Sequence, residues 1–345
     1  MATRARQLIG AWSGRRVLLI GDLMMDEWVF GSVKRISPEA PIPVVNMPLT
    51  PEARADKPGG AGNVAAILLA LGAAVRAVGV VGDDSLGKRL LADLAGRGAD
   101  VSPVLTDPSR PTTHKLRILA GRQQLLRVDT ESDAPLDSAL CRRLHDAIRK
   151  HMEQADVVLV SDYAKGVVAA ASLSLDVIDS ARDAGIPFCA DPKPVNIDLF
   201  HHASLVCPNE SEALQVLGPA ANAVAPAGGQ RAPSIPANVV SAGQALRDRL
   251  EADAVFVTRG DKGIAVFGPD DLVADVPAIT GSGDVGDGTG CGDAVSAASA
   301  LALSAGAGYL EAAEIANAAG GVVSRFVGVH NPTADEIIGW LGRAR

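Results

Sequence analysis

The sequence predicts an α/β fold: three α/β/α layers built on a mostly parallel sheet, with a small β-sheet lid. Two observations predict the layers. Short apolar runs alternate with helix-like stretches, and several of these runs end at a polar residue. A third observation predicts the lid, because two longer segments look extended and contain no helix of useful length. A chain of 345 residues is long enough for one such domain, and we expect residues 1–345 to form it.

The main-sheet elements are expected to alternate along the chain. Strands are expected where a short apolar run precedes a turn or a polar residue, at 16–20, 74–81, 156–160, 187–190, 205–207 and 254–257. Helices are expected where small or amphipathic residues follow, at 61–71, 86–96 (which stops at a glycine), 172–184, from about 209, and from 294. This alternation is typical of parallel strands with helices on both faces.

Two segments interrupt the alternation. The stretches 28–47 and 112–129 show alternating patterns such as Lys115 to Leu119, which predicts lid strands from about 26–58 and 110–130. The stretch 219–239 is rich in Ala, Pro and Gly and has no periodicity, which predicts a flexible surface insertion.

Composition excludes several classes of protein. A net charge of −8 argues against a nucleic-acid partner. The four cysteines are widely spaced, which argues against a zinc site or a disulfide framework and favours reduced thiols in a cytoplasmic protein. The first sixteen residues lack the apolar core of a signal peptide, and no apolar run is long enough to span a bilayer, so we expect no membrane partner.

A glycine-rich loop carries the strongest chemical signal. Six glycines fall within 281–292, and Asp293 follows at the start of an Ala-rich helix. A bare backbone and a helix N-terminus together form a cradle for phosphate. A carboxylate would repel phosphate, but it fits if it contacts a hydroxyl that attacks the phosphate. The pattern therefore predicts phosphoryl transfer to an alcohol; the alternative is that Asp293 is a simple helix N-cap.

Polar residues at strand ends predict where the substrates bind, because ligands of open α/β sheets bind at the carboxyl ends of strands. These endings are Asp22, Asp162, Asp191, Asn209 and Thr258. A dinucleotide fingerprint should open the first βαβ unit, whereas this glycine loop lies near the C-terminus. The chain also contains no G-x-x-x-x-G-K-[ST] motif, which excludes a P-loop kinase.

Three motifs, in this order and separation, resemble the ribokinase-like (PfkB) family of carbohydrate kinases: Gly59 to Ala65, Asn209 to Glu212 and Asp287 to Asp293. Further segments resemble the heptose kinases of lipopolysaccharide precursor synthesis, at 21–26, 35–43, 113–117, 123–127, 161–166 and 191–193. The resemblance implies a ribokinase-like fold. It also implies phosphorylation of D-glycero-β-D-manno-heptose 7-phosphate at its anomeric oxygen to the 1,7-bisphosphate, with ATP and Mg²⁺.

The resemblance also implies catalytic roles. Asp293 would accept the proton of the sugar hydroxyl, and the N–H groups of Gly290, Cys291 and Gly292 would stabilise charge on the transferring phosphoryl group. The helix N-terminus should favour the ionised carboxylate and so weaken Asp293 as a base. The loop has Gly288 and Cys291 where relatives more often have Thr and Ala, but both replacements are small.

Binding residues follow from the same resemblance. Substrate contacts are expected from Asp22, Asp26, Gly59, Gly60, Asn63, Arg117, Gln124, Arg127, Asp162, Lys165 and Lys193. Nucleotide contacts are expected from Asn209, Glu212, Thr258, Arg259, Gly260, Asp287, Thr289 and Asn317, with Glu212 also organising Mg²⁺ through water. Several have structural alternatives: a capping box for Asn209 and Glu212, a helix cap for Asn63, an ordinary helix position for Asn317, and a solvated strand face for the basic residues.

Three other expectations complete this interpretation. The lid strands should pair across a two-fold axis to form a homodimer. Some relatives carry a nucleotidyltransferase domain after the kinase, and since the sequence ends at Arg345 we expect that activity to be absent. The rival functions are a kinase of another sugar, such as a fructose phosphate, a non-catalytic sugar or nucleotide sensor, and a dinucleotide-dependent oxidoreductase.

Overall fold

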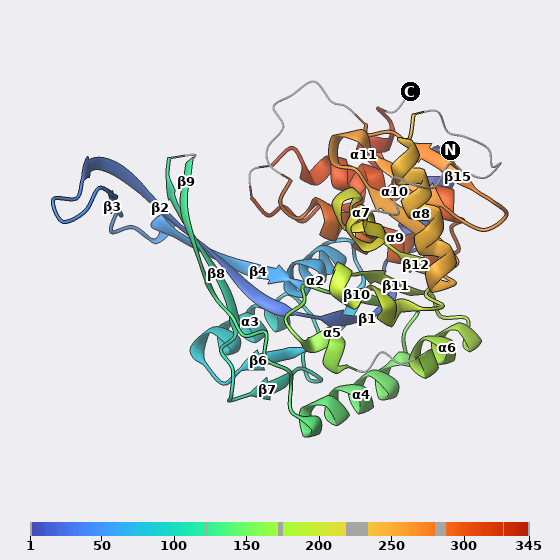
Figure 1. The fold of residues 1–345 in the computed structure, drawn as a ribbon, viewed down its shortest axis with the longest axis horizontal. Helices are drawn as coiled ribbons and strands as arrows, with labels where there is room; N and C mark the ends of the chain where they lie inside the picture. The colour runs from blue at the N-terminus through green and yellow to red at the C-terminus, as the bar shows by residue number, and fades with distance from the viewer. Residues whose placement is uncertain are drawn as a thin grey trace.

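An eight-stranded sheet forms the centre of the fold (Figure 1). The computed structural model describes residues 2–121, 123–171, 175–218, 234–279, 288–326 and 328–343. The strand order is β15-β14-β13-β12-β11-β10-β1-β5, and β14 and β15 are the antiparallel strands at one edge. The strands are β1 (Arg16–Gly21), β5 (Ala74–Val78), β10 (Val157–Ser161), β11 (Phe188–Asp191), β12 (Leu205–Val206), β13 (Ala254–Thr258), β14 (Ile264–Phe267) and β15 (Val273–Val276).

Helices cover both faces of this sheet because its strands are apolar on both sides. In β1, Val17 and Leu19 belong to one hydrophobic core, whereas Leu18 and Ile20 belong to the other. The first core includes α1 (Ala2–Gly10), α2 (Ala61–Ala70), α3 (Ser85–Gly96), α9 (Cys291–Ser304), α10 (Tyr309–Val323) and α11 (Ala334–Leu341). The second includes α4 (Ser138–Met152), α5 (Val167–Ala170), α6 (Leu175–Asp183), α7 (Glu210–Leu217) and α8 (Ala237–Leu250). The predicted three-layer fold is confirmed.

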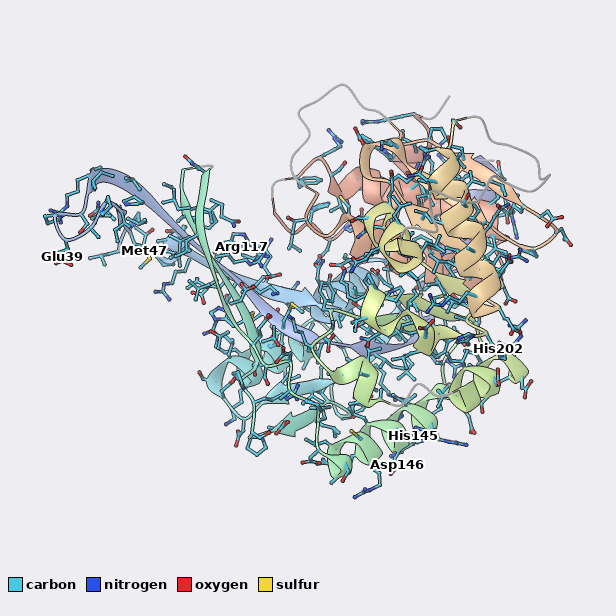
Figure 2. The ribbon with its side chains drawn as sticks, in the orientation of Figure 1. Glu39, Met47, Arg117, His145, Asp146 and His202 are labelled. Carbon is cyan, nitrogen blue, oxygen red and sulfur yellow. The ribbon has the colours of Figure 1, made fainter. Side chains whose placement is uncertain are left out.

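A five-stranded second sheet projects from this body as the lid (Figure 1). Its strands are β2 (Leu23–Ile36), β3 (Pro43–Asn46), β4 (Arg54–Gly60), β8 (Thr113–Ala120) and β9 (Gln123–Thr130). The long strand β2 is buried at its start and largely exposed from Phe30 onward. Figure 2 shows Glu39 and Met47 at the outer end of the lid, away from the body. The lid therefore meets the body where β2 begins and β4 ends.

One predicted strand is divided in the structure, and one predicted insertion ends earlier than expected. The strand expected at 74–81 is divided at Gly79, and β6 (Val80–Gly82) pairs with β7 (Leu105–Asp107) in a separate small sheet. A Cβ at Gly79 would lie 2.7 Å from the Gly21 carbonyl oxygen, so only glycine fits where the chain crosses the end of β1. The predicted insertion 219–239 was also wrong at its end, because α8 begins at Ala237; residues 219–233 lie outside the described part.

The remaining short elements are 3₁₀ turns at Pro51–Ala53, Pro194–Phe200 and Gly260–Lys262. In the part of the chain that the structure describes, no helix combines the length and apolar character needed to cross a bilayer.

The packing of α8 on β14 gives a test of the core. Gly243 faces the ring of Phe267, and an added Cβ would lie 2.1 Å from Phe267 Cε2. We expect Gly243→Ala to lower the free energy of unfolding by about 1–3 kcal/mol, because the buried ring has no room to move. Gly339→Ala in α11 is the matched control: nothing lies within 4 Å of its Cβ, so it should stabilise by about 0.5–1 kcal/mol. Urea denaturation measures both, and effects of the same sign would contradict this packing.

Candidate active site

Asp293 lies buried in the first turn of α9, at the amino end of the helix. Asn63 Nδ2 donates a hydrogen bond of 2.5 Å to Asp293 Oδ2, and Tyr163 Oη donates one of 2.7 Å to Oδ1. The helix N-cap is Gly290, which has a left-handed φ of 81° and no side chain to cap the helix. The alternative that Asp293 is a simple N-cap is therefore wrong, because its carboxylate bonds to two other segments of the chain.

Burial raises the pKa of Asp293 above its ordinary value, although the hydrogen bonds from Asn63 and Tyr163 oppose the shift. The weakening of Asp293 as a base that the helix N-terminus predicts does not determine the net pKa, which burial shifts upward. Removal of the carboxylate from water outweighs the hydrogen bonds from Asn63 and Tyr163. Asp293 is therefore a better proton acceptor than an exposed aspartate.

Local sequence explains how Asn63 and Tyr163 reach Asp293. Asn63 lies in the first turn of α2, directly after β4 ends at Gly60. Gly60 has a φ of 54°, and a Cβ there would lie 2.6 Å from the Asp22 carbonyl oxygen, so the tight turn requires glycine. Tyr163 follows β10 by two residues, and its main-chain N–H donates to Asp22 Oδ2 at 2.8 Å.

A polar pocket of about 140 Å³ opens beside Asp293. It lies at the carboxyl ends of the parallel strands β11, β12 and β13, the edge where ligands of such sheets bind. Seven of the predicted site residues line it: Lys193, Asn209, Glu212, Thr258, Gly290, Gly292 and Asp293. Sequence reasoning left out Tyr163, Cys207 and Ser296, and it named Asp191 only as a polar strand ending. Asp191 is the last residue of β11 and Tyr163 lies two residues after β10, so their place at strand ends could have indicated both. Ser296 lies one turn after Asp293 on the same helix face.

The pocket contains more negative than positive charge. Burial and the neighbouring charge of Asp293 raise the pKa of Asp191 to about 7. Glu212 adds a third carboxylate, and Lys193 Nζ is the ammonium group that faces it, 2.6 Å from Glu212 Oε1. Burial lowers the pKa of Lys193, but the neighbouring Glu212 and Asp191 raise it by more than burial lowers it. The pKa therefore lies above its ordinary value, and the ammonium stays charged. This excess of carboxylates suits a divalent cation.

The side chains of this pocket do not form a site that binds a metal ion directly. Among the described residues, no group of three His, Cys, Asp or Glu side chains could hold a metal ion. Magnesium keeps most of its waters in kinase-type sites and needs only one or two carboxylates together with substrate phosphates. The pocket therefore fits Mg²⁺ held through water better than Mg²⁺ held directly, and the role predicted for Glu212 stays a prediction.

Asn209 and Glu212 form the capping box that was their structural alternative. Asn209 Oδ1 accepts the N–H of Glu212 at 2.9 Å, and Glu212 Oε2 accepts the N–H of Asn209 at 2.9 Å. The same Glu212 side chain reaches Lys193 with its other oxygen. The two residues thus cap the start of α7 and also line the pocket. Their binding of a cation or a nucleotide stays a prediction.

Two of the predicted sugar-binding carboxylates are used by the protein itself. Asp22 accepts the main-chain N–H groups of Tyr163, Lys165 and Val167. Asp162 accepts the main-chain N–H groups of Ala164 and Lys193 and the side-chain amide of Asn196. These bonds occupy most of the lone-pair sites of Asp22 and all of those of Asp162, so the two carboxylates shape the loops that carry Tyr163 and Lys193 and are poorly placed to bind the sugar as well.

Asp26, Gly59 and Arg117 meet where the lid joins the body. Arg117 Nη1 donates to Asp26 Oδ1 at 2.6 Å, and its guanidinium lies 5.2 Å above the ring of Trp28. A Cβ at Gly59 would lie 2.4 Å from Asp26 Oδ2, so glycine leaves the space that the carboxylate occupies. Asp26 also faces Asp293 closely enough that its charge raises the pKa of Asp293.

Other predicted substrate residues do not reach the pocket. Lys165 Nζ is paired with Glu131 at 2.7 Å. Arg127 is paired with Asp129, and both Arg127 and Gln124 lie exposed on β9. Arg127 and Gln124 therefore lie on a solvated strand face, which was the structural alternative to a substrate contact for the basic residues.

Some of the predicted nucleotide residues line the pocket, and others do not. Arg259 is buried and paired with Asp275, so it holds β13 to β15 and does not face the pocket. Asn317 donates to the carbonyl oxygen of Pro277 at 2.8 Å from its place in α10. Gly260 opens a 3₁₀ turn and Thr289 lies in the turn before α9. The N–H of Cys291 donates to Gly288 O at 3.2 Å, which weakens its predicted role toward phosphate. Asp287 lies outside the described residues.

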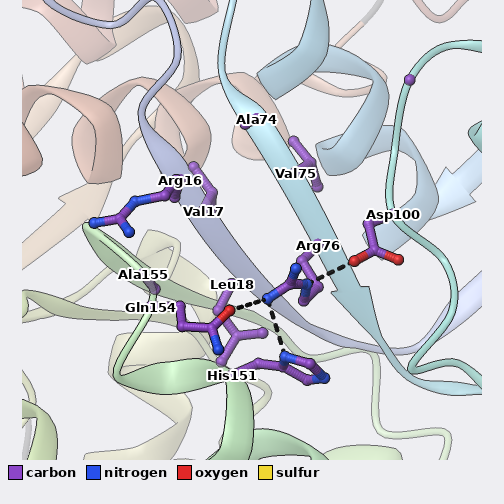
Figure 3. Close-up of a pocket in the computed structure, with 11 residues that line it drawn as sticks. Arg16, Val17, Leu18, Ala74, Val75, Arg76, Asp100, His151, Gln154 and Ala155 are labelled. Atoms are coloured by element: carbon purple, nitrogen blue, oxygen red, sulfur yellow. Dashed lines mark hydrogen bonds and ion pairs between the residues drawn. The ribbon is translucent and has the colours of Figure 1, made fainter.

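A larger cavity of about 460 Å³ lies at the opposite end of the sheet, near the starts of β1 and β5 (Figure 3). Arg76 crosses it and bonds to Asp100, His151 and Gln154. Its size is greater, but it holds no carboxylate near a helix N-terminus and lies at the amino ends of the strands, where sheets of this type do not bind substrate. We assign no function to it.

Fold and site together define a phosphotransferase with an alcohol acceptor: a parallel sheet, a lid, and a buried carboxylate beside a glycine turn at a helix N-terminus. The chain belongs to the pfkB family of carbohydrate kinases, whose model matches residues 21–336. The predicted family and enzyme class are confirmed.

Comparisons with individual proteins agree with this class. The chain is 40% identical over 312 residues to the Bifunctional protein HldE of Bradyrhizobium diazoefficiens, which covers 90% of this chain and 59% of that protein. It is 38% identical to the HldE of Geobacter metallireducens over 94% of this chain and 62% of that protein. The chain thus spans about three fifths of the length of these relatives.

Solved structures share the fold at lower identity. Phosphofructokinase-2 from Escherichia coli, in complex with substrates and products, has a TM-score of 0.74 and 20% identity, over 95% of this chain and 98% of that one. Ribokinase from Arabidopsis thaliana, complexed with ribose and ATP, has a TM-score of 0.68 and 19% identity, over 95% and 99%.

The pKa of Asp191 gives a test of the pocket's charge. A folded-state pKa of about 7, against an ordinary value of 3.8, means that stability falls as pH rises from about 4 to 7 and stays low above 7. We expect Asp191→Asn to raise the free energy of unfolding at pH 8 by about 1–4 kcal/mol, with little difference at pH 4. Denaturation at both pH values measures this.

Asp84→Asn is a control of opposite sign. Burial raises the pKa of Asp84, but hydrogen bonds from Gly87 and Thr112 lower it more, so its charged form is favoured in the folded state. This variant should lose stability at pH 8, because the stabilisation by Asp84 is present above its unfolded pKa and lost as pH falls. A loss of stability at pH 8 in Asp191→Asn would contradict the charge excess in the pocket.

Proposed function

We propose that this chain is an ATP-dependent kinase that phosphorylates the anomeric hydroxyl of D-glycero-β-D-manno-heptose 7-phosphate. The product would be the 1,7-bisphosphate, a precursor in ADP-heptose and lipopolysaccharide core synthesis. The observation that carries the kinase chemistry is the buried Asp293 carboxylate, held by Asn63 and Tyr163 at the pocket's edge. The similarity to HldE proteins supports the choice of sugar.

The reaction needs little covalent chemistry from the protein. The anomeric oxygen forms a bond to the γ-phosphorus of ATP, the bond from that phosphorus to the bridging oxygen breaks, and ADP leaves with the electron pair. Asp293 accepts the proton of the attacking hydroxyl, which its raised pKa favours. Asn63 Oδ1 is buried without a hydrogen-bond donor among the described residues, so it can accept a hydrogen bond from the bound sugar.

The nucleotide side of the pocket supports the use of ATP. The residues Gly290 and Gly292 lie at the N-terminus of α9, where free N–H groups can bind an anion. Lys193 lies in the same pocket and can neutralise charge on the transferring group when a phosphate displaces Glu212 from it. Mg²⁺, held through water by Glu212, would neutralise the nucleotide phosphates.

The distal phosphate of the sugar is best placed near Arg117. Its guanidinium already lies beside Asp26, which faces Asp293, so a sugar that spans the two would bring its far end to Arg117. Lys193, predicted for the same phosphate, lies at the transfer end instead. Lys165 is paired with Glu131 and needs a rearrangement before it can take part.

A kinase of another sugar phosphate remains the alternative, and the fold of E. coli Phosphofructokinase-2 fits it equally well. The predicted cytoplasmic location also stays a proposal.

One assay separates these functions. We expect ATP consumption with D-glycero-β-D-manno-heptose 7-phosphate to exceed that with fructose 6-phosphate, and Asp293→Asn to lower kcat by about 10² or more. Asp137→Asn is the control, because Asp137 caps α4 and Asn caps helices equally well. Equal rates with the two sugars would reject the heptose assignment, and full turnover by Asp293→Asn would reject the mechanism.

We also propose that the lid mediates a homodimer. Most of the exposed large hydrophobic side chains among the described residues lie on the lid: Phe30, Val33, Ile36, Ile42, Met47, Leu49, Leu126 and Val128. An apolar surface of this extent on a projecting sheet is costly in a monomer and typical of an interaction site.

Charge placed on the lid should break this dimer. We expect sedimentation at micromolar concentration to give twice the chain mass of 35.3 kDa, and Ile36→Glu to shift it to the monomer. Leu310→Glu, an equally polar change at an exposed position on α10, should leave the dimer intact. A monomeric parent protein would contradict the proposal.

A further inference from the structure

Tyr163 contacts the Asp293 carboxylate, but in the reaction proposed above it transfers no proton and contacts no reacting atom. Its phenol oxygen donates to Asp293 Oδ1 at 2.7 Å, while Asn63 holds Oδ2 at 2.5 Å. An ionised carboxylate has about four lone-pair sites, so two remain for an acceptor hydroxyl. We infer that Tyr163 is a positioning residue, whose hydroxyl fixes the rotation of the Asp293 carboxylate so that a free lone pair faces the acceptor hydroxyl. The inference rests on the proposed function.

The protein holds Tyr163 firmly enough for this role. Its main-chain N–H donates to Asp22 Oδ2 at 2.8 Å, and Lys193 Nζ lies 5.4 Å from the centre of its ring. The hydroxyl is therefore fixed by contacts at the backbone and at the ring, which involve two different segments. Burial and the charge of Asp293 raise the pKa of Tyr163 well above its ordinary value, so the phenol stays protonated and acts only as a donor to Asp293. It orients the base and does not itself take the substrate proton.

The charges around Asp293 determine what loss of this hydroxyl does. Asp26 on β2 raises the pKa of Asp293, Asp191 at the end of β11 is coupled to it with the same sign, and Lys193 lowers it. Asn63 and Tyr163 are the hydrogen-bond donors that lower it. Loss of the phenol hydroxyl removes one of these stabilising groups, so the pKa of Asp293 rises. The base acts in its ionised form. When the solution is acidified, the variant therefore loses activity at a higher pH than the parent protein does.

Tyr163→Phe isolates the hydroxyl, because it keeps the ring beneath Lys193 and the main-chain bond to Asp22. With ATP and D-glycero-β-D-manno-heptose 7-phosphate, we expect kcat to fall by about 10- to 100-fold while KM changes less than about threefold. The acid limb of the kcat profile should move up by about one pH unit.

The chain has two tyrosines, and the second supplies a matched control. Tyr309 also bonds to an aspartate, Asp253, but it lies at the start of α10, away from the pocket. Tyr309→Phe should leave kcat, KM and the acid limb unchanged. A kcat for Tyr163→Phe within twofold of the parent, or a fall in kcat with an unmoved acid limb, overturns the inference.

A measurement without substrate separates this inference from the proposed function. In protein labelled with ¹³C at the aspartate carboxyl carbons, the Asp293 signal is assigned by its absence in Asp293→Asn and then titrated. Tyr163→Phe should raise the pKa of Asp293 by about one unit, and Tyr309→Phe should not change it. If the parent phosphorylates no sugar, the proposed function fails while this titration still decides the hydrogen bond. An unchanged pKa in Tyr163→Phe overturns the inference even where the kinase activity is established.

Discussion

The site depends on one buried carboxylate and the two hydrogen bonds that hold it. Asp293 joins the start of α9 to α2 through Asn63 and to the loop after β10 through Tyr163. An ionised carboxylate is costly to bury, and two donors compensate part of that cost. The remainder is visible as the raised pKa of Asp293, which makes it a usable base. The interaction that ties three segments together therefore also acts on the carboxylate that we propose as the proton acceptor.

A second group of buried carboxylates supports the first. Asp22 collects main-chain N–H groups from the loop after β10, and Asp162 collects that of Lys193 from the loop after β11. These loops would otherwise leave unpaired N–H groups at the edge of the sheet. With the loops fixed, Tyr163 and Lys193 line one pocket, and their positions do not depend on a bound ligand.

Sequence patterns predicted the architecture well, because alternating apolar runs and strand-end polar residues depend on local chemistry and on the parallel sheet alone. They also indicated Asp293 as the candidate base, since a glycine run before a helix is a local signal. They did not distinguish a carboxylate that faces substrate from one that accepts main-chain N–H groups, as Asp22 does. They also placed Arg259 at the nucleotide, although it pairs with Asp275 sixteen residues later. Such partners depend on how loops fold back, and no period or spacing in the sequence encodes that. Tyr163 was missed for the same reason.

The most direct test of the account is a crystal structure of the protein with a non-hydrolysable ATP analogue and the sugar phosphate. We expect the terminal phosphate to lie against the main-chain amides of Gly290 and Gly292. We also expect the acceptor oxygen of the sugar to lie within about 2.6–3.2 Å of a carboxylate oxygen of Asp293. A terminal phosphate bound away from the start of α9, or an acceptor oxygen that faces a group other than Asp293, would contradict the account.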